Sequence, residues 1–459
     1  MLWALARESS TRKRMVGGWL GGVLYWVVVC NWIGSVLDAY GGLSGALSLL
    51  ALVLFAAVKA LHWAAFAWGA GFLIRQPWAI PGIAALWAGL ERTQGPLGFA
   101  WLMLGNAGIS MALPLRLGPV LGVYGLSFLF AAVSTALALM LLRRPRKELL
   151  WLTPLAGLGL LPAVEVAQRP GQQAVSVQMN VAGDTVWTPE EKERAARQFS
   201  LLSLESALRP GLPAPALMLW PEVPAPFYYY DDPAFRQQMT ETARLASTPL
   251  MFGTVAYTAE KRPLNSGVLL GARGQLLGRY DKIFLVPFGE FVPRGFGWIE
   301  QISGEAGAYE AGREVKVFPL QYGEGREHSV GAIICYESAF PHLVRRFVNG
   351  GAEVIVNLTN DGYFGRSPGP RNQHLLLARM RAVENGRWIL RSANDGITAS
   401  IDPAGVVHDR LPEFTRQATR LRFAWLREKT FYTRHGDWFA WCCLALGAAL
   451  SVWQARRSA

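Results

Sequence analysis

Cysteine is scarce in this chain, with only four residues among 459. Cys30, Cys442 and Cys443 lie among Trp, Val, Leu and Ala, where a thiol behaves as a small buried hydrophobe. None of them is an obvious disulfide partner for Cys335, which ends the apolar run Val330–Ile334. By position alone, an isolated thiol is more often a buried structural residue than a reactive one. A reactive role for Cys335 can therefore be inferred only if other residues support it.

Other features are missing as well. The six histidines are scattered without the spacing of metal ligands, so the sequence predicts no metal site. Internal repeats and low-complexity tracts are absent, which excludes a solenoid and a chain of strongly biased composition. No small-residue cleavage site follows the first apolar stretch, and further apolar segments do, so that stretch is not interpreted as a secretory signal.

Hydrophobic residues, by contrast, make up 51% of the chain and are concentrated in its first third. A helix of about 20 apolar residues crosses about 30 Å of hydrocarbon. Lys59 and His62 fall inside a stretch long enough for a tilted helix, so we expect Lys59 to reach the membrane surface. About six membrane-spanning helices are predicted, at residues 15–37, 43–74, 78–90, 117–142, 149–164 and 438–453.

Basic residues flank these stretches and set their orientation. With the basic clusters on the cytoplasmic side, five spans occupy residues 1–166, an extracytoplasmic domain occupies 167–436, and a last span with a short tail occupies 437–459. Much of the net charge of +12 then meets anionic lipid, and no nucleic-acid partner is needed to explain it. The basic residues in question are Arg7, Arg12, Lys13, Arg14, Arg75, Arg143, Arg144, Arg146, Lys147, Arg456 and Arg457.

From about Gln173 the pattern changes to short β-like runs that alternate with helical stretches. Helices are predicted at 189–208, with Thr188 as N-cap, and at 371–385. This alternation predicts a layered α/β domain of about 260 residues, large enough for a substantial core. The predicted strands are 174–178, 216–220, 250–255, 267–270, 329–334, 354–358 and 388–392.

Three polar residues stand at or just beyond the ends of β-like runs: Glu222, Lys282 and Cys335. Strand ends in α/β folds are where side chains converge on a site. Glu222 can take the thiol proton, the thiolate can attack a carbonyl carbon, and Lys282 can stabilise the oxyanion. The backbone N–H of Tyr336 is a second oxyanion donor by its position. Taken singly, Glu222 and Lys282 would more often be a surface acid and a salt-bridged base.

Longer strings surround these residues. Glu222 stands in LWPE, Lys282 in YDKIFLVPFGEFVP at 280–293, and Cys335 in ICYESAFP at 334–341. NLTNDGYFG at 357–365 and QHLLLARMRAVENGR at 373–387 follow. Together they resemble the apolipoprotein N-acyltransferase family of the carbon-nitrogen hydrolase, or nitrilase, superfamily. GVYGLSF at 122–128, Asn180 with Trp187, and one apolar helix after the domain extend the resemblance over nearly the whole chain.

The resemblance implies an α/β nitrilase-like αββα sandwich inserted between transmembrane helices, and an enzyme without a cofactor. It implies that Cys335 takes an acyl chain from a phospholipid, typically phosphatidylethanolamine, as a thioester. The acceptor would be the α-amine of the N-terminal cysteine of a diacylglyceryl apolipoprotein. The implied location is the bacterial inner membrane, where the bilayer is itself a partner and the catalytic domain lies on the periplasmic side.

The resemblance also implies roles for neighbouring residues. Glu290 would hold Lys282, Tyr336 would act near the nucleophile, and Glu337 would hydrogen-bond within the site; for the two glutamates the alternative is a surface or interhelical salt bridge. Trp187 is as well explained by packing as by substrate contact. Two aromatic loops, with Phe227 and Tyr228 in one and Trp298 in the other, are predicted to form a lid or membrane contact, with ordinary loop packing as the alternative.

The chain departs from the family in places. Family members usually have two further membrane helices before the segment that matches Met15 onward, so we expect an N-terminally shortened form. Losing an even number of spans leaves the catalytic domain on the same side. Gly362 and Tyr363 stand where Ala and Trp are common, and Asp395 stands where Asn is common.

Two other functions remain open at this stage. A membrane-anchored amidase or nitrilase that passes its acyl group to water would use the same acyl-enzyme, although an anchor does not require five spans. A non-catalytic membrane receptor or transporter is opposed by the intact Glu222, Lys282 and Cys335, and by the lack of paired intramembrane charges.

Overall fold

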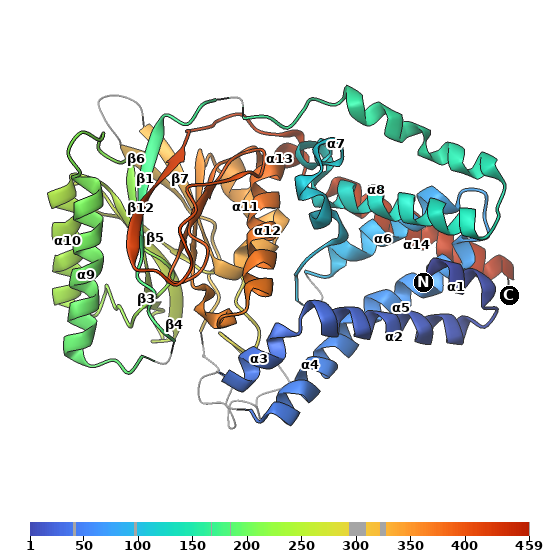
Figure 1. The fold of residues 1–459 in the computed structure, drawn as a ribbon, viewed down its shortest axis with the longest axis horizontal. Helices are drawn as coiled ribbons and strands as arrows, with labels where there is room; N and C mark the ends of the chain where they lie inside the picture. The colour runs from blue at the N-terminus through green and yellow to red at the C-terminus, as the bar shows by residue number, and fades with distance from the viewer. Residues whose placement is uncertain are drawn as a thin grey trace. The chain divides into compact units, whose positions relative to one another are not determined.

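The chain forms two compact units, one helical and one of mixed α/β structure (Figure 1). The computed structural model describes residues 1–458 except 40–42, 96–98, 167, 184, 293–308 and 322–326. The helical unit comprises Met1–Val164 and Thr430–Ala459, and the α/β unit comprises Glu165–Lys429. In the sequence, the α/β unit is thus inserted between two parts of the helical unit.

The helical unit contains the long apolar stretches. Among its described residues, three helices are long and apolar enough to cross a membrane: Gly45–Leu73, Gly118–Leu141 and Trp438–Ser458. Thr11–Val29 and Trp32–Asp38 pass the same test together but are bent by 59°. The elements are α1 (Leu2–Arg7), α2 (Thr11–Val29), α3 (Trp32–Ala39), α4 (Gly45–Lys59), α5 (Leu61–Leu73), α6 (Ala79–Thr93), η1 (Leu104–Ser110), α7 (Ala112–Leu115), α8 (Gly118–Leu141), η2 (Arg146–Leu160), α13 (Phe431–His435) and α14 (Trp438–Ser458).

Three of the six expected spans differ from a full-length α-helix, the first of them because it is the bent pair α2 and α3. The third expected span forms α6, which has only 15 residues. The fifth forms η2, a 3-10 helix with Pro154 inside it. Proline has no N–H to donate to the preceding turn, which disfavours a regular α-helix at that point. The number of spans therefore stays a prediction.

Lys59 does not reach the surface of its unit as expected. Only 4% of the residue is exposed. Its ammonium donates to Gln94 Oε1 at 3.2 Å and to the Phe99 carbonyl at 2.7 Å, and it lies 4.6 Å from the centre of the Trp26 ring. These contacts satisfy a buried charge inside an apolar unit, so Lys59 joins the end of α4 to the chain that follows α6.

Helices α6 and α14 approach closely where α6 carries Gly89. A Cβ atom there would lie 2.5 Å from the backbone nitrogen of Leu444 and would also overlap its Cα atom. Small residues permit such backbone contact between apolar helices, which gain stability from packing and not from exclusion of water. A side chain at this position must therefore push the two helices apart.

We expect Gly89→Ala to lower the thermal unfolding midpoint of the detergent-solubilised protein by several degrees, because the methyl group would meet the α14 backbone. Gly21→Ala in α2 is the matched control, since a Cβ atom there meets nothing within 4 Å and alanine favours a helix. Unfolding midpoints followed by tryptophan fluorescence measure both variants. Equal midpoints would contradict the close packing.

The described residues of the α/β unit form two six-stranded sheets. The first has the order β12-β1-β2-β3-β4-β5 and the second β11-β10-β9-β8-β7-β6. The strands are β1 (Gln172–Gln178), β2 (Leu217–Leu219), β3 (Leu250–Tyr257), β4 (Pro263–Leu270), β5 (Leu276–Asp281), β6 (Val317–Gln321), β7 (Glu327–Ile334), β8 (Val354–Thr359), β9 (Ile389–Ala393), β10 (Ala399–Ile401), β11 (Val407–His408) and β12 (Gln417–Phe423).

Helices cover the outer face of each sheet, as Figure 1 shows. On the first sheet, α9 (Pro189–Ala207) and α10 (Pro233–Ala246) pack through one buried apolar cluster that includes Phe199 and Met239. On the second, α11 (Pro341–Asn349) and α12 (Pro368–Asn385) contact β7, β9 and β10.

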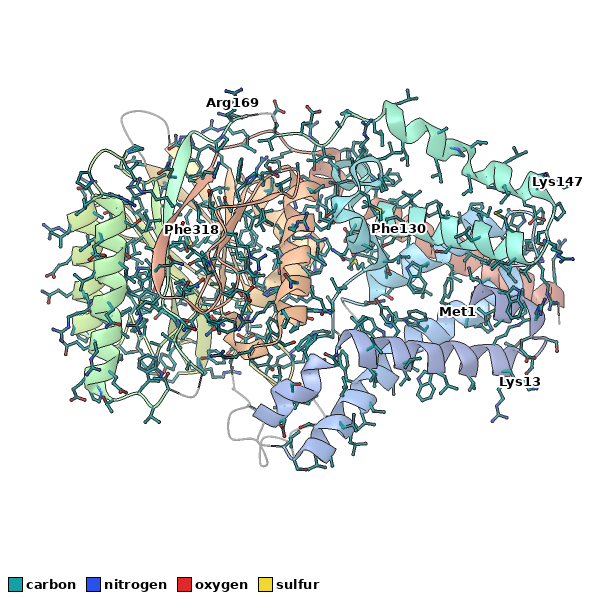
Figure 2. All side chains as sticks on the ribbon, in the orientation of Figure 1. Met1, Lys13, Phe130, Lys147, Arg169 and Phe318 are labelled. Atoms are coloured by element: carbon teal, nitrogen blue, oxygen red, sulfur yellow. The ribbon has the colours of Figure 1, made fainter. Side chains whose placement is uncertain are left out.

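The inner faces of the two sheets meet. Ser176 of β1 donates to Ser392 of β9 at 2.9 Å, and both residues are fully buried. Figure 2 shows side chains filling the layers, with the fully buried Phe318 of β6 among them. The predicted αββα sandwich is confirmed.

All seven predicted strands of this unit are present, within a few residues of the expected bounds. The predicted N-cap of α9 is present too, because Thr188 Oγ1 accepts from the Glu191 N–H at 3.2 Å. Five strands and helices α10 and α11 were not predicted. Four of those strands, β5, β6, β11 and β12, lie at sheet edges, where one side of the strand has no neighbour and polar residues are tolerated.

Candidate active site

The three residues singled out from the sequence follow three strands and come together. Glu222 follows β2, Lys282 follows β5, and Cys335 follows β7. Lys282 Nζ lies 3.0 Å from Glu222 Oε1, and the charges of both residues act on the Cys335 thiol. β2 and β5 belong to the first sheet and β7 to the second, so the sandwich itself assembles the cluster.

A second carboxylate completes the surroundings of Lys282. Glu290 Oε1 lies 2.9 Å from Lys282 Nζ, where the predicted supporting role requires it to be. Asn265 of β4 donates its Nδ2 to Glu222 Oε1 at 2.8 Å and to Glu290 Oε1 at 2.7 Å. The two carboxylates are thus held alike, with one oxygen of each shared between Lys282 and Asn265.

Backbone N–H groups bind the remaining carboxylate oxygens. Asn360 N donates to Glu222 Oε2 at 3.0 Å, and Val286 N donates to Glu290 Oε2 at 2.8 Å. Burying a carboxylate is costly unless its lone pairs find donors, and here every oxygen has at least one. Asn265 and the Asn360 N–H are site groups that sequence reasoning missed, because neither stands in a distinctive place.

Unusual backbone conformations occur beside the acidic residues and at the thiol. Val223, Phe288 and Cys335 have positive φ angles of 24°, 61° and 49°, in the left-handed region that side chains other than glycine rarely adopt. Each such residue costs of order 1–3 kcal/mol and persists only where surrounding contacts hold it. All three lie within two residues of Glu222, Glu290 or Cys335, which is typical of an active site.

The backbone of Glu222 also approaches β3 closely. A Cβ atom on Gly253 of β3 would lie 2.5 Å from Val223 N and 2.8 Å from Glu222 Cα. Glycine at this position therefore lets the chain after β2 pass directly against its neighbour. That contact places the Glu222 carboxylate inside the sandwich and away from solvent.

The electrostatics of the site favour a charged lysine and a neutral thiol. Burial opposes the charge on Lys282, but the carboxylates of Glu222 and Glu290 outweigh it and raise the pKa of the ammonium well above its ordinary value. Burial, reinforced by the Glu222 carboxylate, raises the pKa of Cys335, although Lys282 and a hydrogen bond with Thr359 oppose the shift. Cys335 therefore rests as a thiol beside the Glu222 carboxylate.

Glu337 fastens the short helix η4 (Cys335–Ala339) to the chain at and after the end of β5. Its Oε1 accepts from Tyr280 Oη and from Ile283 N, each at 2.7 Å, and from Phe284 N at 3.2 Å. Its Oε2 accepts from Ile334 N at 2.7 Å. Burial raises the pKa of Glu337 to about 7, while these donors favour the charged form. The interhelical salt bridge considered from the sequence is not what this residue forms.

Tyr336 is buried next to Cys335 in the chain, with its ring edge-on to Phe340 at 5.0 Å. Two further tyrosines, which sequence reasoning missed, lie near the charged cluster. Burial raises the pKa of Tyr309 and of Tyr363 to about 12, and Glu290 adds to both shifts. Tyr309 lies between β5 and β6 and Tyr363 lies after β8, so no local sequence pattern connects them.

The aromatic residues expected in a lid fall in different environments. Phe227 is fully buried and stacks on Phe235 with ring centres 4.5 Å apart, so it lies in the core and not in an exposed loop. Trp187 is partly buried against the same core cluster, and Tyr228 is partly exposed. Trp298 lies outside the residues that the structure describes.

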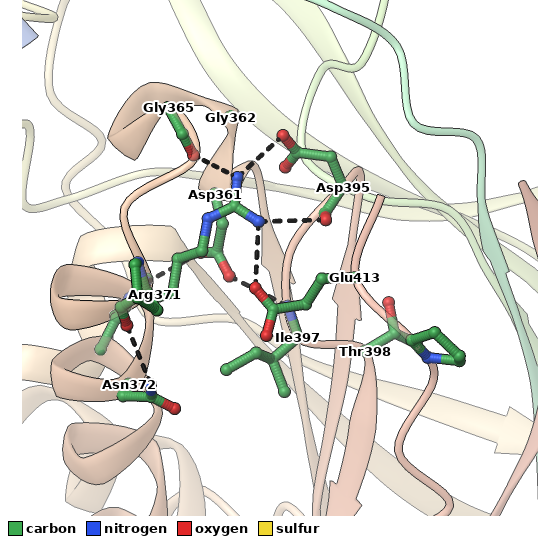
Figure 3. A network of polar contacts seen from close by, with 12 residues as sticks. Asp361, Gly362, Gly365, Arg371, Asn372, Asp395, Ile397, Thr398 and Glu413 are labelled. Carbon is green, nitrogen blue, oxygen red and sulfur yellow. Dashed lines mark hydrogen bonds and ion pairs between the residues drawn. The ribbon is translucent and has the colours of Figure 1, made fainter. Parts of the chain in front are cut away.

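A charged network supports the turn after β8 (Figure 3). Arg371 of α12, fully buried, donates to the Gly365 carbonyl at 2.5 Å and to Asp395 Oδ2 at 3.1 Å. It also donates to Glu413 Oε2 at 3.2 Å. This fixes the short helix η5 (Asp361–Phe364), which carries Tyr363. Nowhere in the described ranges do three His, Cys, Asp or Glu side chains gather as metal ligands would.

Asp395 gives this network a pH dependence. Burial raises its pKa from 3.8 to about 6, with Arg371 opposing the shift and Asp361 adding to it. The unfolded chain therefore loses this proton at a lower pH than the native protein, and the native protein loses stability as the pH rises between those values.

Asp395→Asn removes this titration. As the pH rises from about 4.5 to about 7, we expect Asp395→Asn to become more stable relative to wild type, by at most about 3 kcal/mol in the free energy of unfolding. Its thermal midpoint should rise relative to that of wild type over the same range. Thermal unfolding of both proteins in one buffer series measures the difference. A difference that stays constant over this range would contradict the shifted pKa.

Comparisons with known proteins agree with this architecture. Residues 174–421 match the carbon-nitrogen hydrolase family, and residues 1–136 match the apolipoprotein N-acyltransferase N-terminal domain. An apolipoprotein N-acyltransferase of Geobacter metallireducens is 31% identical over 100% of this chain and 90% of its own length. That of Nitrosomonas europaea is also 31% identical, over 100% of this chain and 92% of its own length.

A solved structure of a Nesterenkonia amidase from the nitrilase superfamily is 17% identical and covers 59% of this chain and 95% of its own, with a TM-score of 0.45. The assignment comes from the sequence matches, which span both units. On these matches, the chain belongs to the apolipoprotein N-acyltransferase family within the carbon-nitrogen hydrolase superfamily.

Proposed function

We propose that this enzyme transfers an acyl chain from a phospholipid to an apolipoprotein, through a thioester on Cys335. The observation that carries the proposal is the buried cluster in which Lys282 lies between Glu222 and Glu290 beside the Cys335 thiol. Relatives that match both units are named apolipoprotein N-acyltransferases, which supports the choice of acceptor.

In the first step, Glu222 removes the thiol proton as Cys335 Sγ attacks the ester carbonyl carbon of the phospholipid. A C–S bond forms, and the negative charge that develops on the carbonyl oxygen is stabilised by Lys282 and by the Tyr336 N–H. The ester C–O bond then breaks, and the proton on Glu222 passes to the departing lysophospholipid oxygen. Because the thiol rests protonated, the base and the nucleophile act together.

In the second step, the α-amine of the acceptor's N-terminal cysteine attacks the thioester carbon. An N–C bond forms and the C–S bond breaks, while Glu222 takes a proton from the amine and returns it to Cys335. Covalent catalysis suits this reaction because two lipid substrates use one site in turn. Glu290 and Glu337 serve both steps as positioning residues, since they hold Lys282 and the short helix η4 that begins at Cys335.

We propose an inner-membrane location with the catalytic domain, about residues 167–436, on the periplasmic side of the bilayer. Three helices of suitable length and composition support membrane insertion. Both chain termini lie toward one end of the helical unit (Figure 1), and Lys13 and Lys147 lie toward that same end in Figure 2. Basic residues gathered at one end favour a cytoplasmic position for it.

Trp187, Tyr228 and Trp298 are proposed as contacts for the lipid substrates. The partly exposed Tyr228 lies near enough to Tyr309 and Tyr257 to affect their ionisation, which places it close to the charged cluster. Aromatic side chains suit a substrate that has both an apolar chain and a polar head group. For Trp187 and Trp298 the proposal rests on the sequence alone.

The product identifies the reaction. We expect purified wild-type protein with phosphatidylethanolamine and a diacylated lipopeptide, bearing a free N-terminal cysteine, to give triacylated peptide by mass spectrometry. Cys335→Ala should give none, because no thioester can form. Cys30→Ala is the matched control and should retain activity. Release of free fatty acid without triacylated peptide would assign the protein as a hydrolase instead.

The base is tested separately. Glu222→Gln keeps an oxygen that can accept from Lys282 but cannot take a proton, so we expect the rate of acyl-enzyme formation to fall by roughly 10³-fold or more. Glu193→Gln on the exposed face of α9 is the control. Single-turnover formation of the acyl-enzyme gives the rate. Near-normal turnover in Glu222→Gln would remove Glu222 from the mechanism.

A further inference from the structure

The left-handed conformation of Cys335 needs contacts on both sides of the residue. On the amino-terminal side, Ile334 N donates to Glu337 Oε2 at 2.7 Å. On the other side, the Cys335 carbonyl oxygen lies 3.0 Å from Nε2 of His374, a residue of α12 that is 1% exposed. The proposed mechanism gives His374 no part, although it is a buried histidine in direct contact with the nucleophile's backbone.

The hydrogen on His374 can be assigned from its partners. A carbonyl oxygen only accepts, so Nε2 must carry a hydrogen and donate it to Cys335. The other ring nitrogen, Nδ1, lies 3.2 Å from Asp361 Oδ1 and 3.2 Å from Arg391 Nη2. Whether Nδ1 accepts from Arg391 or donates to Asp361, Nε2 remains the donor toward Cys335.

A buried ion pair holds the His374 ring on the side that faces away from Cys335. Arg391 Nη2 lies 2.7 Å from both carboxylate oxygens of Asp361, and both residues are fully buried. Arg391 also donates to Asn357 Oδ1 at 2.8 Å and to the Ile397 carbonyl at 3.0 Å. Because the pair is held by two strands and a turn, the imidazole ring has little freedom to rotate.

We propose that His374 is a positioning residue for Cys335. Its Nε2–H holds the carbonyl of Cys335, and the Asp361–Arg391 pair holds the imidazole, so that Sγ stays beside the Glu222–Lys282 ion pair. The proposal rests on the proposed function only in that Cys335 is the nucleophile. It adds a histidine, an aspartate and an arginine that act through the backbone and do not touch the substrate.

Substitutions at His374 can distinguish the effect of the Nε2–H donor from the effect of filling the space that the ring occupies. Glutamine places its amide nitrogen near the site of Nε2 and can still donate to the Cys335 carbonyl. Asparagine reaches only as far as Nδ1, and phenylalanine fills the space without a donor. His408→Asn is the matched control, because His408 also pairs with an aspartate, Asp402, at 2.8 Å but on β11.

Two rates are measured on the full-length protein in detergent. The first is alkylation of Cys335 by iodoacetamide, followed on its own peptide by mass spectrometry so that the other three cysteines do not contribute. The second is single-turnover acylation by phosphatidylethanolamine, analysed separately for its maximal rate constant and for the lipid concentration that gives half that rate. We expect His374→Asn and His374→Phe to lower the maximal rate constant by about 10- to 100-fold without changing the half-saturating concentration, because small displacements of a reacting atom are costly.

Alkylation should slow in the same two variants, because the thiol then loses its proton to Glu222 less readily. His374→Gln should stay within about threefold of wild type in both rates, and His408→Asn should match wild type. The proposal is overturned if Gln is as slow as Asn, which indicates a structural role alone, or if Asn and Phe are as fast as wild type.

The alkylation rate does not depend on acyl transfer. If no protein forms an acyl-enzyme while the alkylation rates still separate Gln from Asn, the proposed function fails and the role of His374 stands. If all variants acylate alike and transfer to the lipopeptide alike, the proposed function stands and the role of His374 fails.

Discussion

The rest of this active site depends on one interaction, the burial of the Lys282 ammonium between the carboxylates of Glu222 and Glu290. Two negative groups share one positive partner, so the cluster is stable only because Asn265 and two backbone N–H groups bind the remaining lone pairs. A buried ion pair adds little stability of its own. Here the ion pairs hold the side chains of Glu222, Lys282 and Glu290 in place, since neither carboxylate can move without leaving a buried charge unpaired.

The carboxyl end of β8 connects this cluster to the nucleophile. Three successive residues each serve a different group: Thr359 hydrogen-bonds the Cys335 thiol, the Asn360 N–H binds Glu222, and Asp361 binds His374 and Arg391. Parallel pairing of β8 with β7 fixes the register of these three residues against Cys335. One short segment, residues 359–361, therefore contacts Glu222, the Cys335 thiol and, through His374, the Cys335 backbone.

How far the sequence predicts this site depends on the kind of contact. Glu222, Lys282 and Cys335 could be found because each ends a β-like run, and strand ends converge. Asn265 and His374 could not, because one is an ordinary polar residue within a strand and the other lies on a helix, and their partners are distant in the chain. Phe227 shows the reverse error, since an aromatic run resembles a surface loop but fills the core beside α10.

The raised pKa of Cys335 has a consequence for the resting enzyme. On the periplasmic side, where we place the site, thiols are prone to oxidation, and the thiolate is the form that reacts. A thiol kept neutral by burial and by the Glu222 carboxylate is scarce as thiolate until a substrate carbonyl and the oxyanion donors offset the cost of charge. The carboxylate that we propose as the base thus also keeps Cys335 protonated between turnovers. Reactivity then requires the substrate, which allows a single unpaired cysteine to persist there without a disulfide partner.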